Sequence, residues 1–334
     1  MGCAGLQGSF DPADDAALTM FVAAAAAEVN FRSFHCDYAL ARRLGRGAFG
    51  AVYSATRSAG RERQSVAVKV VDTGVRSSSG RNKGLDRKRL YCAVKEAAVL
   101  RSLPTSDHVV QFRGFYSDGP FTYIVMERCA SGLLPFFLQM SSVTEESMKC
   151  IFRDMLAGIS VCHAAGIAHR DVKHDNFLVA CAEPGASNDG TGAKIKLCDF
   201  GLASRVSAAS ANELSGVVGT PSFMAPEMLS GAPYGVKVDV WALGALAYSL
   251  LFGRWPYSPS EDSGPAMKLA ISSGSSPPSF RSRPDLTQIS APCCAWVEAL
   301  LERDAERRPS AEDALAHPAL LEPWADGAEA SLMP

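Results

Sequence analysis

The segment His169–Asn176 (HRDVKHDN) and the triplet Asp199–Gly201 (DFG) constrain this chain more than any other feature of its sequence. They supply a carboxylate, a lysine, an amide and a second carboxylate in a fixed order: Asp171, Lys173, Asn176 and Asp199. Amide and carboxylate oxygens are hard ligands that suit Mg²⁺. A carboxylate beside them can accept the proton of a hydroxyl group. This order of groups is the one that phosphoryl transfer from Mg-ATP requires.

Further motifs stand before and after these two segments. A lone G-x-G-x-x-G is weak evidence, but here several motifs follow one another: Gly45–Val52 (GRGAFGAV), Val66–Lys69 (VAVK), Glu96 in a helical pattern, Gly219–Glu227 (GTPSFMAPE) and Asp239–Gly244 (DVWALG). From about residue 35 to residue 321 their order resembles the protein-kinase family. The resemblance implies an α+β, bilobal protein-kinase fold. A small N-terminal β-sheet lobe with one main helix would precede a larger, mainly helical C-terminal lobe.

The resemblance also suggests where the parts of the chain begin and end. We expect an N-terminal extension over residues 1–34, a kinase domain over 35–321 and a tail over 322–334, with the N-lobe at about 35–128 and the C-lobe at about 132–321. Residues 38–72 predict a strand, a glycine turn and two more strands, and 109–115 and 121–127 predict two further strands. The Ser-, Gly- and Lys/Arg-rich run at 74–83 is typical of an exposed loop.

Helical segments are predicted from propensity, caps and apolar runs. Leu90–Leu103 reads as a helix that Pro104 ends, and Thr144–Ala165 as a long helix with Thr144 as its N-cap. Val240–Gly253 reads as a core helix, because it is too short to span a bilayer. Met20–Val29 is alanine-rich and could either pack on the domain or remain loose.

Bulk properties set the class of protein. The chain has 334 residues, 47% of them hydrophobic, and a net charge of −2, which gives no support for nucleic-acid binding. Its ten cysteines lack metal-ligand spacing, so we expect a reduced, intracellular compartment, the cytoplasm first of all. Met1-Gly2-Cys3 would suit acylation of Gly2 and Cys3 and thereby membrane contact, but Leu6 stands where Ser or Thr is usual. The alternative is an unmodified N-terminus.

The resemblance implies a role for each residue of the catalytic centre. Asp171 would be the base, Lys173 would lie against the transferring phosphate, and Thr220 would support both. Lys69 would contact the α- and β-phosphates of ATP and pair with Glu96. Asn176 and Asp199 would hold Mg²⁺, with Mn²⁺ as a second cation that such ligands accept. The remaining nucleotide contacts would come from residues around the glycine turn and the adenine pocket: Leu44, Gly45, Gly47, Phe49, Gly50, Val52, Ala67, Met126, Glu127, Cys129 and Leu178.

Other motif residues are expected to support the site. Glu227 would pair with a late arginine, for which Arg307 is the candidate, and Asp239 would hold the backbone of the catalytic loop. Arg170 would either grip a phosphate on the activation segment, Asp199–Glu227, or pair with a local acid. Many kinases carry a regulatory phosphosite four residues before the residue that matches Thr220. Here that residue is Gly216, so activation by phosphorylation is in doubt, and Glu213 could supply a fixed negative charge instead.

Lys173 and the run from Gly219 to Phe223 resemble serine/threonine kinases, with calcium/calmodulin-dependent and checkpoint-like kinases as the closest in pattern. The implied function is transfer of the γ-phosphate of ATP to Ser or Thr hydroxyls of protein substrates by a monomer. The alternative is a pseudokinase that serves as a nucleotide-binding scaffold. Pseudokinases commonly lack the residues that match Lys69, Asp171 or Asp199, and all three are present.

Overall fold

A computed structural model describes residues 33–47, 50–58, 64–76, 82–141, 143–180, 192–207, 212–280 and 289–321. Within these ranges the chain divides into two compact units. The N-terminal unit holds the described residues up to Pro104 together with Val110–Cys129, and the C-terminal unit holds Thr105–Val109 and the residues from Ala130 onward. Several expectations lie outside the described residues: acylation at Gly2 and Cys3, the helix at Met20–Val29, Phe49 of the glycine turn and the tail at 322–334.

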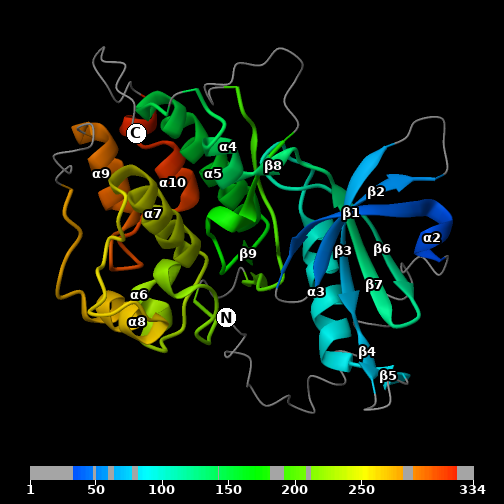
Figure 1. The fold of residues 1–334 in the computed structure, drawn as a ribbon. Helices are drawn as coiled ribbons and strands as arrows, with labels where there is room; N and C mark the ends of the chain where they lie inside the picture. The colour runs from blue at the N-terminus through cyan, green and yellow to red at the C-terminus, as the bar shows by residue number, and fades with distance from the viewer. Residues whose placement is uncertain are drawn as a thin grey trace. The chain divides into compact units, whose positions relative to one another are not determined.

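The N-terminal unit is built on a five-stranded antiparallel sheet (Figure 1). Its strands, in spatial order, are β1 Tyr38–Arg46, β2 Ala51–Arg57, β3 Ser65–Asp72, β7 Phe121–Glu127 and β6 Phe112–Asp118. The three strands expected within residues 38–72 are confirmed. The strand expected at 109–115 begins later, at Phe112, because Val109 instead forms a parallel bridge with Leu197 in the C-terminal unit.

One face of this sheet carries an aromatic cluster. The short helix α2, Phe34–Asp37, inserts Phe34 among three tyrosines, and its side chain has no exposed area. The Phe34 ring stacks on Tyr123 with 4.2 Å between centroids and on Tyr38 with 5.4 Å, and it meets Tyr116 edge-on at 5.7 Å. Val66 and Val68 of β3 belong to the same cluster. Burying so much aromatic area is a large source of stability for a small unit.

The helix α3, Arg87–Ser102, packs against β3, β6 and β7, and Figure 1 shows it beside the sheet. It begins three residues before the predicted start at Leu90. The reason is the cap: Asp86 accepts a hydrogen bond from the backbone N–H of Arg89 at 3.1 Å and so satisfies a donor of the first turn. Its buried side chains include Ala93, Val94, Glu96, Ala97, Val99 and Leu100.

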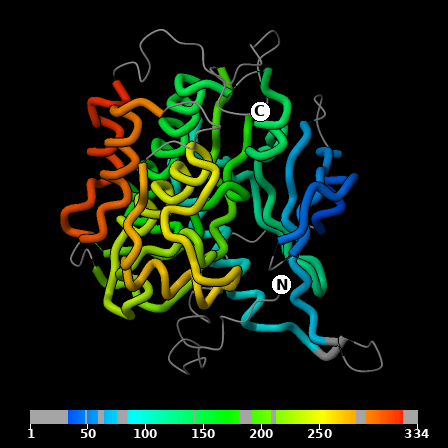
Figure 2. The backbone as a smooth tube through the Cα atoms, turned by 60° about the vertical axis from the view of Figure 1, so that its left-hand side comes forward, coloured from blue at the N-terminus to red at the C-terminus, as the bar shows by residue number. Residues whose placement is uncertain are grey.

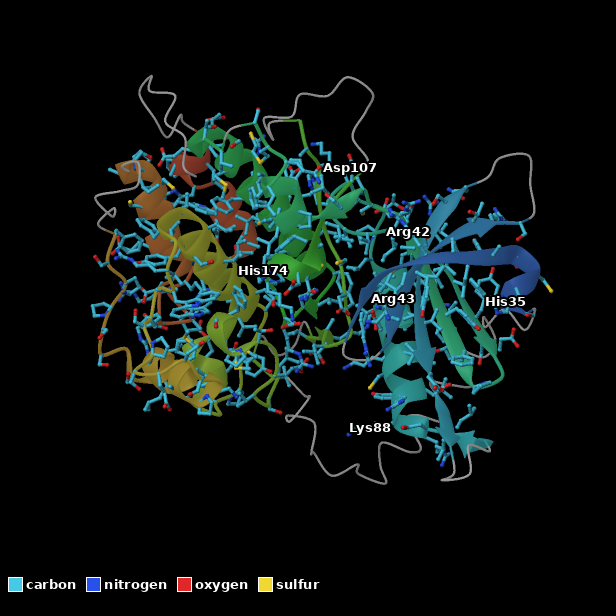
Figure 3. The ribbon with its side chains drawn as sticks, viewed as in Figure 1. His35, Arg42, Arg43, Lys88, Asp107 and His174 are labelled. Carbon is cyan, nitrogen blue, oxygen red and sulfur yellow. The ribbon has the colours of Figure 1, made fainter. Side chains whose placement is uncertain are left out.

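Between β3 and α3 the structure differs from expectation. The run at 74–83, predicted to be an exposed loop, contributes to a two-stranded hairpin of β4 Gly74–Arg76 and β5 Asn82–Leu85. In Figure 2 this cyan hairpin extends away from the sheet. A two-stranded ladder is held by backbone hydrogen bonds, which any residue type can form. The composition of this hairpin can therefore still be typical of a loop. Lys88, labelled in Figure 3, lies on α3 near this hairpin.

Strand β1 forms one edge of the sheet, and its middle is exposed. Arg42 and Arg43, labelled in Figure 3, stand on this strand beside irregularities in the pairing with β2. Exposed charges and bulges discourage an edge strand from pairing with another chain.

The C-terminal unit is mainly helical, which confirms the expected division into a small sheet unit and a larger helical one. Its helices are α4 Leu133–Phe137, α5 Glu145–Ala164, α6 Pro226–Leu229, α7 Lys237–Phe252, α8 Gly264–Ser273, α9 Ala291–Leu300, α10 Ala311–Leu315 and α11 Pro318–Leu321, with 3₁₀ turns η1 His174–Asn176 and η2 Pro221–Phe223. Short strands lie among them: β8 Ser131–Gly132, β9 Ile167–Ala168, β10 Phe177–Val179, β11 Ile195–Leu197 and β12 Ser204–Arg205.

The two long helices of this unit follow their sequence signals. Thr144 caps α5 through a capping box in which Thr144 and Ser147 exchange hydrogen bonds, so the predicted N-cap is confirmed. Helix α7 is buried along nearly its whole length, as expected of a core helix, and it packs against α5 and α9. Among the residues described, no helix combines the length and the apolar character needed to cross a membrane.

Candidate active site

The catalytic loop at 169–176 is held by one buried carboxylate. Asp239 at the start of α7 is 1% exposed, and its two oxygens accept the backbone N–H groups of His169 at 2.7 Å and Arg170 at 2.8 Å. The contact predicted for Asp239 is therefore present. His163 Nε2 lies 3.0 Å from the same carboxylate. Burial alone would raise the pKa of Asp239, but the hydrogen bond and charge of His163, together with the nearby His169 and its backbone N–H, outweigh burial and hold that pKa below its ordinary value.

His169 links the catalytic loop to the segment that carries Asp199. Its ring is fully buried, with Nε2 3.0 Å from the carbonyl oxygen of Cys198 and Nδ1 3.3 Å from the backbone nitrogen of Asp171. A carbonyl oxygen only accepts, so Nε2 carries the hydrogen and Nδ1 accepts from Asp171. The ring of Phe200 meets the imidazole edge-on at 5.0 Å. His169 opens the catalytic-loop motif, but no role was predicted for it from its residue type.

Asp171, Lys173 and Thr220 form one hydrogen-bonded group. Asp171 Oδ2 lies 2.7 Å from Lys173 Nζ, and Thr220 Oγ1 donates to Asp171 Oδ1 at 2.9 Å. Lys173 Nζ also donates to Thr220 Oγ1 at 3.1 Å. Each member contacts the other two, so the carboxylate is fixed in direction and stays beside a cation. The structure thus brings together three of the residues that the sequence predicted as catalytic.

Gly219 allows Thr220 to come this close. Its φ is +100°, and a Cβ atom built on it would lie 2.5 Å from the carbonyl oxygen of Arg170. A side chain would therefore both strain the backbone and push the segment away from the catalytic loop.

Asn176 and Asp199 stand at adjacent ends of paired strands. Strand β10 begins just after Asn176 and β11 ends just before Cys198, with Phe177 opposite Leu197, and the N–H of Cys198 donates to the carbonyl of Asn176 at 2.9 Å. Asn176 Nδ2 donates to the carbonyl oxygen of Asp171 at 2.7 Å, so Oδ1 is the atom that can face a cation. One amide oxygen and one carboxylate are hard donors that fit a small divalent metal ion.

The N-terminal unit holds a buried ion pair. Lys69 Nζ lies 2.7 and 2.8 Å from the two carboxylate oxygens of Glu96, and the two residues are 4% and 3% exposed. The predicted pairing of strand β3 with helix α3 is therefore present. Val52, Ala67 and Met126 share the sheet face of Lys69, because Val52 pairs with Lys69 and Ala67 with Met126 across neighbouring strands.

The predicted nucleotide residues outside this face vary in their setting. Leu44 is exposed on β1, and Glu127 already donates its backbone N–H to Gln111 at 2.9 Å, so that hydrogen is not open to an adenine ring. Cys129 is half-buried at the end of the N-terminal unit. Leu178 is half-buried on β10 of the C-terminal unit.

The glycine turn joins β1 to β2. The N–H of Gly47 donates to the carbonyl of Gly50 at 2.8 Å, and Gly45 pairs with Val52 in the ladder. A Cβ atom on Gly50 would lie 2.3 Å from the carbonyl oxygen of Val70, so the fold itself requires this glycine. A Cβ on Gly45 would meet no atom within 4 Å, and one on Gly47 would come no nearer than 3.9 Å. Packing therefore leaves these two positions open to a ligand.

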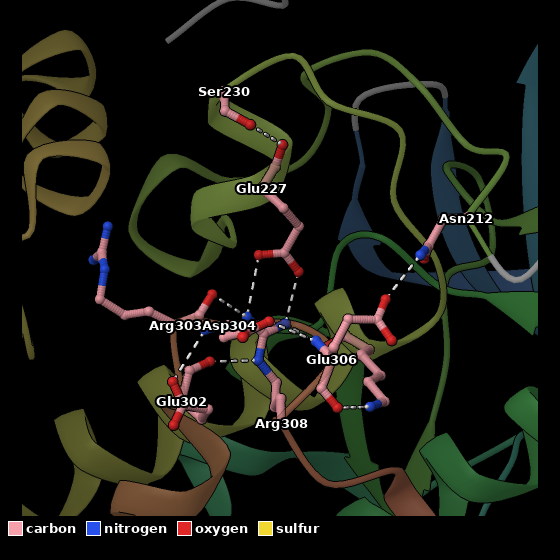
Figure 4. Close-up of polar contacts among 9 residues, drawn as sticks. Asn212, Glu227, Ser230, Glu302, Arg303, Asp304, Glu306 and Arg308 are labelled. Atoms are coloured by element: carbon pink, nitrogen blue, oxygen red, sulfur yellow. Dashed lines mark hydrogen bonds and ion pairs between the residues drawn. The ribbon is translucent and has the colours of Figure 1, made fainter.

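The partner of Glu227 is Arg308, not Arg307, which corrects the prediction. Arg308 is fully buried and forms a two-pronged ion pair with the Glu227 carboxylate, with N–O distances of 2.7 and 3.1 Å (Figure 4). It also donates to the carbonyls of Lys237 and Glu302 and lies 5.1 Å from the ring centroid of Trp241. Arg307 instead points outward and lies 3.4 Å from Glu302. The turn before α10 sets which of the two adjacent arginines faces the core.

Arg170 contacts a backbone carbonyl and a tyrosine hydroxyl, and neither partner was predicted. It adopts a φ of +64°, its Nε donates to the carbonyl of Leu202 at 2.9 Å, and Nη1 lies 3.3 Å from the hydroxyl of Tyr234. Within the described parts of the chain it forms no ion pair, so the local salt bridge is absent. No sequence motif pointed to Tyr234.

Two comparisons bear on this geometry. A family model described as "Protein kinase domain" matches residues 38–320. Calcium/calmodulin-dependent serine/threonine-protein kinase 1 of Oryza sativa subsp. japonica is 33% identical over 91% of this chain, and calcium-dependent protein kinase 9 of the same plant is 34% identical over 84%. Serine/threonine-protein kinase PEPKR2 of Arabidopsis thaliana is 31% identical over 85%. The match covers 46%, 45% and 53% of these relatives, so the chain spans about half of their length.

Proposed function

This chain belongs to the protein kinase family, and from that membership and the geometry of its catalytic loop we propose that it is an active serine/threonine protein kinase. The observation that carries the proposal is the group of Asp171, Lys173 and Thr220, joined by contacts of 2.7 to 3.1 Å. A carboxylate held in this way is set to receive a hydroxyl group. The lysine beside it offsets the negative charge of a transferring phosphate.

In this proposal Asp171 orients the acceptor hydroxyl and takes its proton late, as the bond to phosphorus forms. A carboxylate is a weak base toward an alcohol, so its first contribution is position. Thr220 donates to Oδ1 of Asp171, whereas Lys173 contacts Oδ2. Lys173 and Thr220 also match the serine/threonine pattern, which supports Ser and Thr as acceptors rather than Tyr.

Mg-ATP would be the phosphoryl donor. Asn176 Oδ1 and the Asp199 carboxylate would hold Mg²⁺ or Mn²⁺, which neutralises charge on the phosphates when it is bound. Lys69, kept in place by Glu96, would contact the phosphates, and the backbone of Gly45 and Gly47 could approach them without a side chain between. Pseudokinases commonly lack the residues that match Lys69, Asp171 or Asp199, and the sequence has all three as well as Asn176.

The test is phosphorylation of a peptide array by the purified full-length chain with radiolabelled Mg-ATP, followed by phosphoamino-acid analysis. We expect phosphoserine and phosphothreonine. Asp171→Asn should lower kcat by about 10²–10⁴-fold, the range for loss of a general base. The same variant should still bind nucleotide, whereas Asp199→Asn should lose Mg-dependent binding. Near-normal turnover by Asp171→Asn, or phosphotyrosine as the main product, contradicts the proposal.

A further inference from the structure

Tyr234, between α6 and α7, joins the activation segment to the catalytic loop. It is 1% exposed, and its backbone exchanges two hydrogen bonds with Leu214, with N–O distances of 3.0 and 2.9 Å. Its hydroxyl lies 2.9 Å from the carbonyl oxygen of Gly216 and 3.2 Å from that of Ser215. Arg170 Nη1 approaches the same hydroxyl at 3.3 Å. One buried phenol therefore contacts the arginine next to Asp171 and the backbone of the segment.

Each hydrogen-bonding group around the Tyr234 hydroxyl can be assigned a donor or an acceptor role without conflict. A guanidinium only donates, so Arg170 donates to the phenol oxygen, and the single phenol hydrogen is left for the carbonyls of Gly216 and Ser215. The other arm of Arg170, through Nε, donates to the carbonyl of Leu202. Arg170 thus reaches the segment shortly after Asp199 directly, and reaches it again at residues 215–216 through Tyr234.

The position that Tyr234 contacts is the one where a regulatory phosphosite would be expected. That residue is Gly216, which has no hydroxyl to modify. A phosphate there would join Arg170 to the segment by charge, and here a neutral phenol makes the same connection.

Other contacts of the activation segment also form without a phosphate (Figure 4). Asn212 donates to Glu306 at 3.1 Å, and Lys237 donates to the carbonyl of Glu306 at 3.0 Å. The carboxylate of Glu213 accepts the N–H of Ser207. The fixed charge predicted at Glu213 therefore serves the segment itself rather than Arg170.

We propose that Tyr234 is a positioning residue that takes the place of an activation-segment phosphate and makes phosphoryl transfer independent of phosphorylation in that segment. The inference rests on the proposed kinase function. Tyr234 holds residues 214–216, and the segment from there to Thr220 carries the hydroxyl that contacts Asp171. Removing the phenol oxygen should therefore loosen the acceptor side of the reaction and leave ATP binding, which depends on Lys69 and Asp199, unchanged.

The test compares Tyr234→Phe with Tyr248→Phe. Tyr248 is a matched control in the same unit: it is also 1% exposed, and its hydroxyl donates to a backbone carbonyl, that of Ser279, at 2.7 Å, away from the catalytic loop. All proteins are treated with phosphatase and verified by intact mass. With a serine peptide that the wild type phosphorylates, we expect Tyr234→Phe to lose about ten- to a hundredfold in kcat/KM, the range for a hydrogen bond to a charged group. The KM for ATP should stay within twofold, and Tyr248→Phe should match the wild type.

A second measurement needs no activity. Hydrogen exchange of the backbone amides at residues 212–220 should be faster in Tyr234→Phe than in Tyr248→Phe, with α7 and α9 equally protected in both. If the wild type transfers no phosphate, the proposed function fails, and this exchange difference still decides the role of Tyr234. The inference is overturned if phosphatase treatment abolishes wild-type activity, or if Tyr234→Phe matches Tyr248→Phe in both measurements.

Discussion

At the scale of the residue, Arg308 shows how one buried cation is stabilised. Its guanidinium contacts the Glu227 carboxylate, three carbonyl oxygens and the face of Trp241. A buried charge is tolerated when it is paired and its donors are used. Arg308 meets both conditions and thereby ties α6 to α7 and to the turn before α10.

We expect Arg308→Ala to lower the free energy of unfolding by about 3–5 kcal/mol, because it leaves the Glu227 carboxylate without its partner in a largely buried site. The matched control is Arg307→Ala, whose side chain is 75% exposed and which should change stability by less than about 0.5 kcal/mol. Urea unfolding followed by tryptophan fluorescence measures both. Equal effects of the two substitutions would show that the ion pair adds little.

The glycine turn separates two roles of glycine. Gly50→Ala should destabilise the N-terminal unit by about 1–3 kcal/mol, because the new methyl group collides with the Val70 carbonyl. Gly47→Ala should leave the melting temperature unchanged, because the fold has room for the methyl group. It should raise the KM for ATP, because the methyl group would collide with a bound phosphate. Thermal unfolding and ATP titrations distinguish them. A lower melting temperature for Gly47→Ala would show that Gly47 is needed for stability rather than for ATP binding.

How far the site could be predicted depends on what holds each residue. Lys69, Asp171, Asn176 and Asp199 stand in short motifs, so their chemistry and spacing could be read directly. Tyr234 could not be predicted, because its hydroxyl serves backbone carbonyls that any residue can present. The backbone of the turn before α10 decides whether Arg307 or Arg308 faces Glu227. Two adjacent arginines look alike in the sequence, so this direction could not be predicted.

Among the helices and strands, those that could be predicted have apolar residues spaced at regular intervals, where one face is buried, or in a continuous run, where the whole element is buried. The valines of β3 alternate, and α7 is apolar throughout, so both could be recognised. The hairpin of β4 and β5 could not be recognised, because it is held by its backbone ladder and its apolar residues Val75 and Leu85 are exposed. Helix α2 is four residues long, and its place depends on one ring and its distant partners.

We expect Phe34→Ala to lower the free energy of unfolding of the N-terminal unit by about 3–5 kcal/mol, the usual cost of emptying a buried aromatic site. The ring contacts Tyr38, Tyr116 and Tyr123, which come from three different strands, so the loss should reach the whole sheet. Cys36→Ala is the control, since Cys36 is exposed on the same helix. Denaturant unfolding measures both, and a change below about 1 kcal/mol for Phe34→Ala would mean that the site collapses readily.

At the scale of the whole molecule, acid should act through Asp239. Its folded pKa lies below the ordinary value. Its contribution to stability is therefore complete above the unfolded pKa of about 3.9 and is lost as the pH falls through the folded pKa. Unfolding by urea between pH 3 and pH 7 should show a decline below about pH 4.

Asp239→Asn supplies the control for that decline. It should be less stable than the wild type at pH 7 by about 3 kcal/mol, because the backbone N–H groups of His169 and Arg170 lose a charged acceptor. It should also lose less stability than the wild type on acidification. Parallel curves for the two proteins would assign the acid sensitivity to other carboxyl groups.

The family model begins at residue 38, after the residue that fills the aromatic face of the sheet. A protein cut to begin at that boundary would keep every catalytic motif and lose Phe34. Tyr38, Tyr116 and Tyr123 would then face water as one apolar patch, and such patches favour self-association. For this chain, the shortest fragment that keeps the stability of the N-terminal unit and does not self-associate should start at or before Ser33, even though the catalytic motifs begin later.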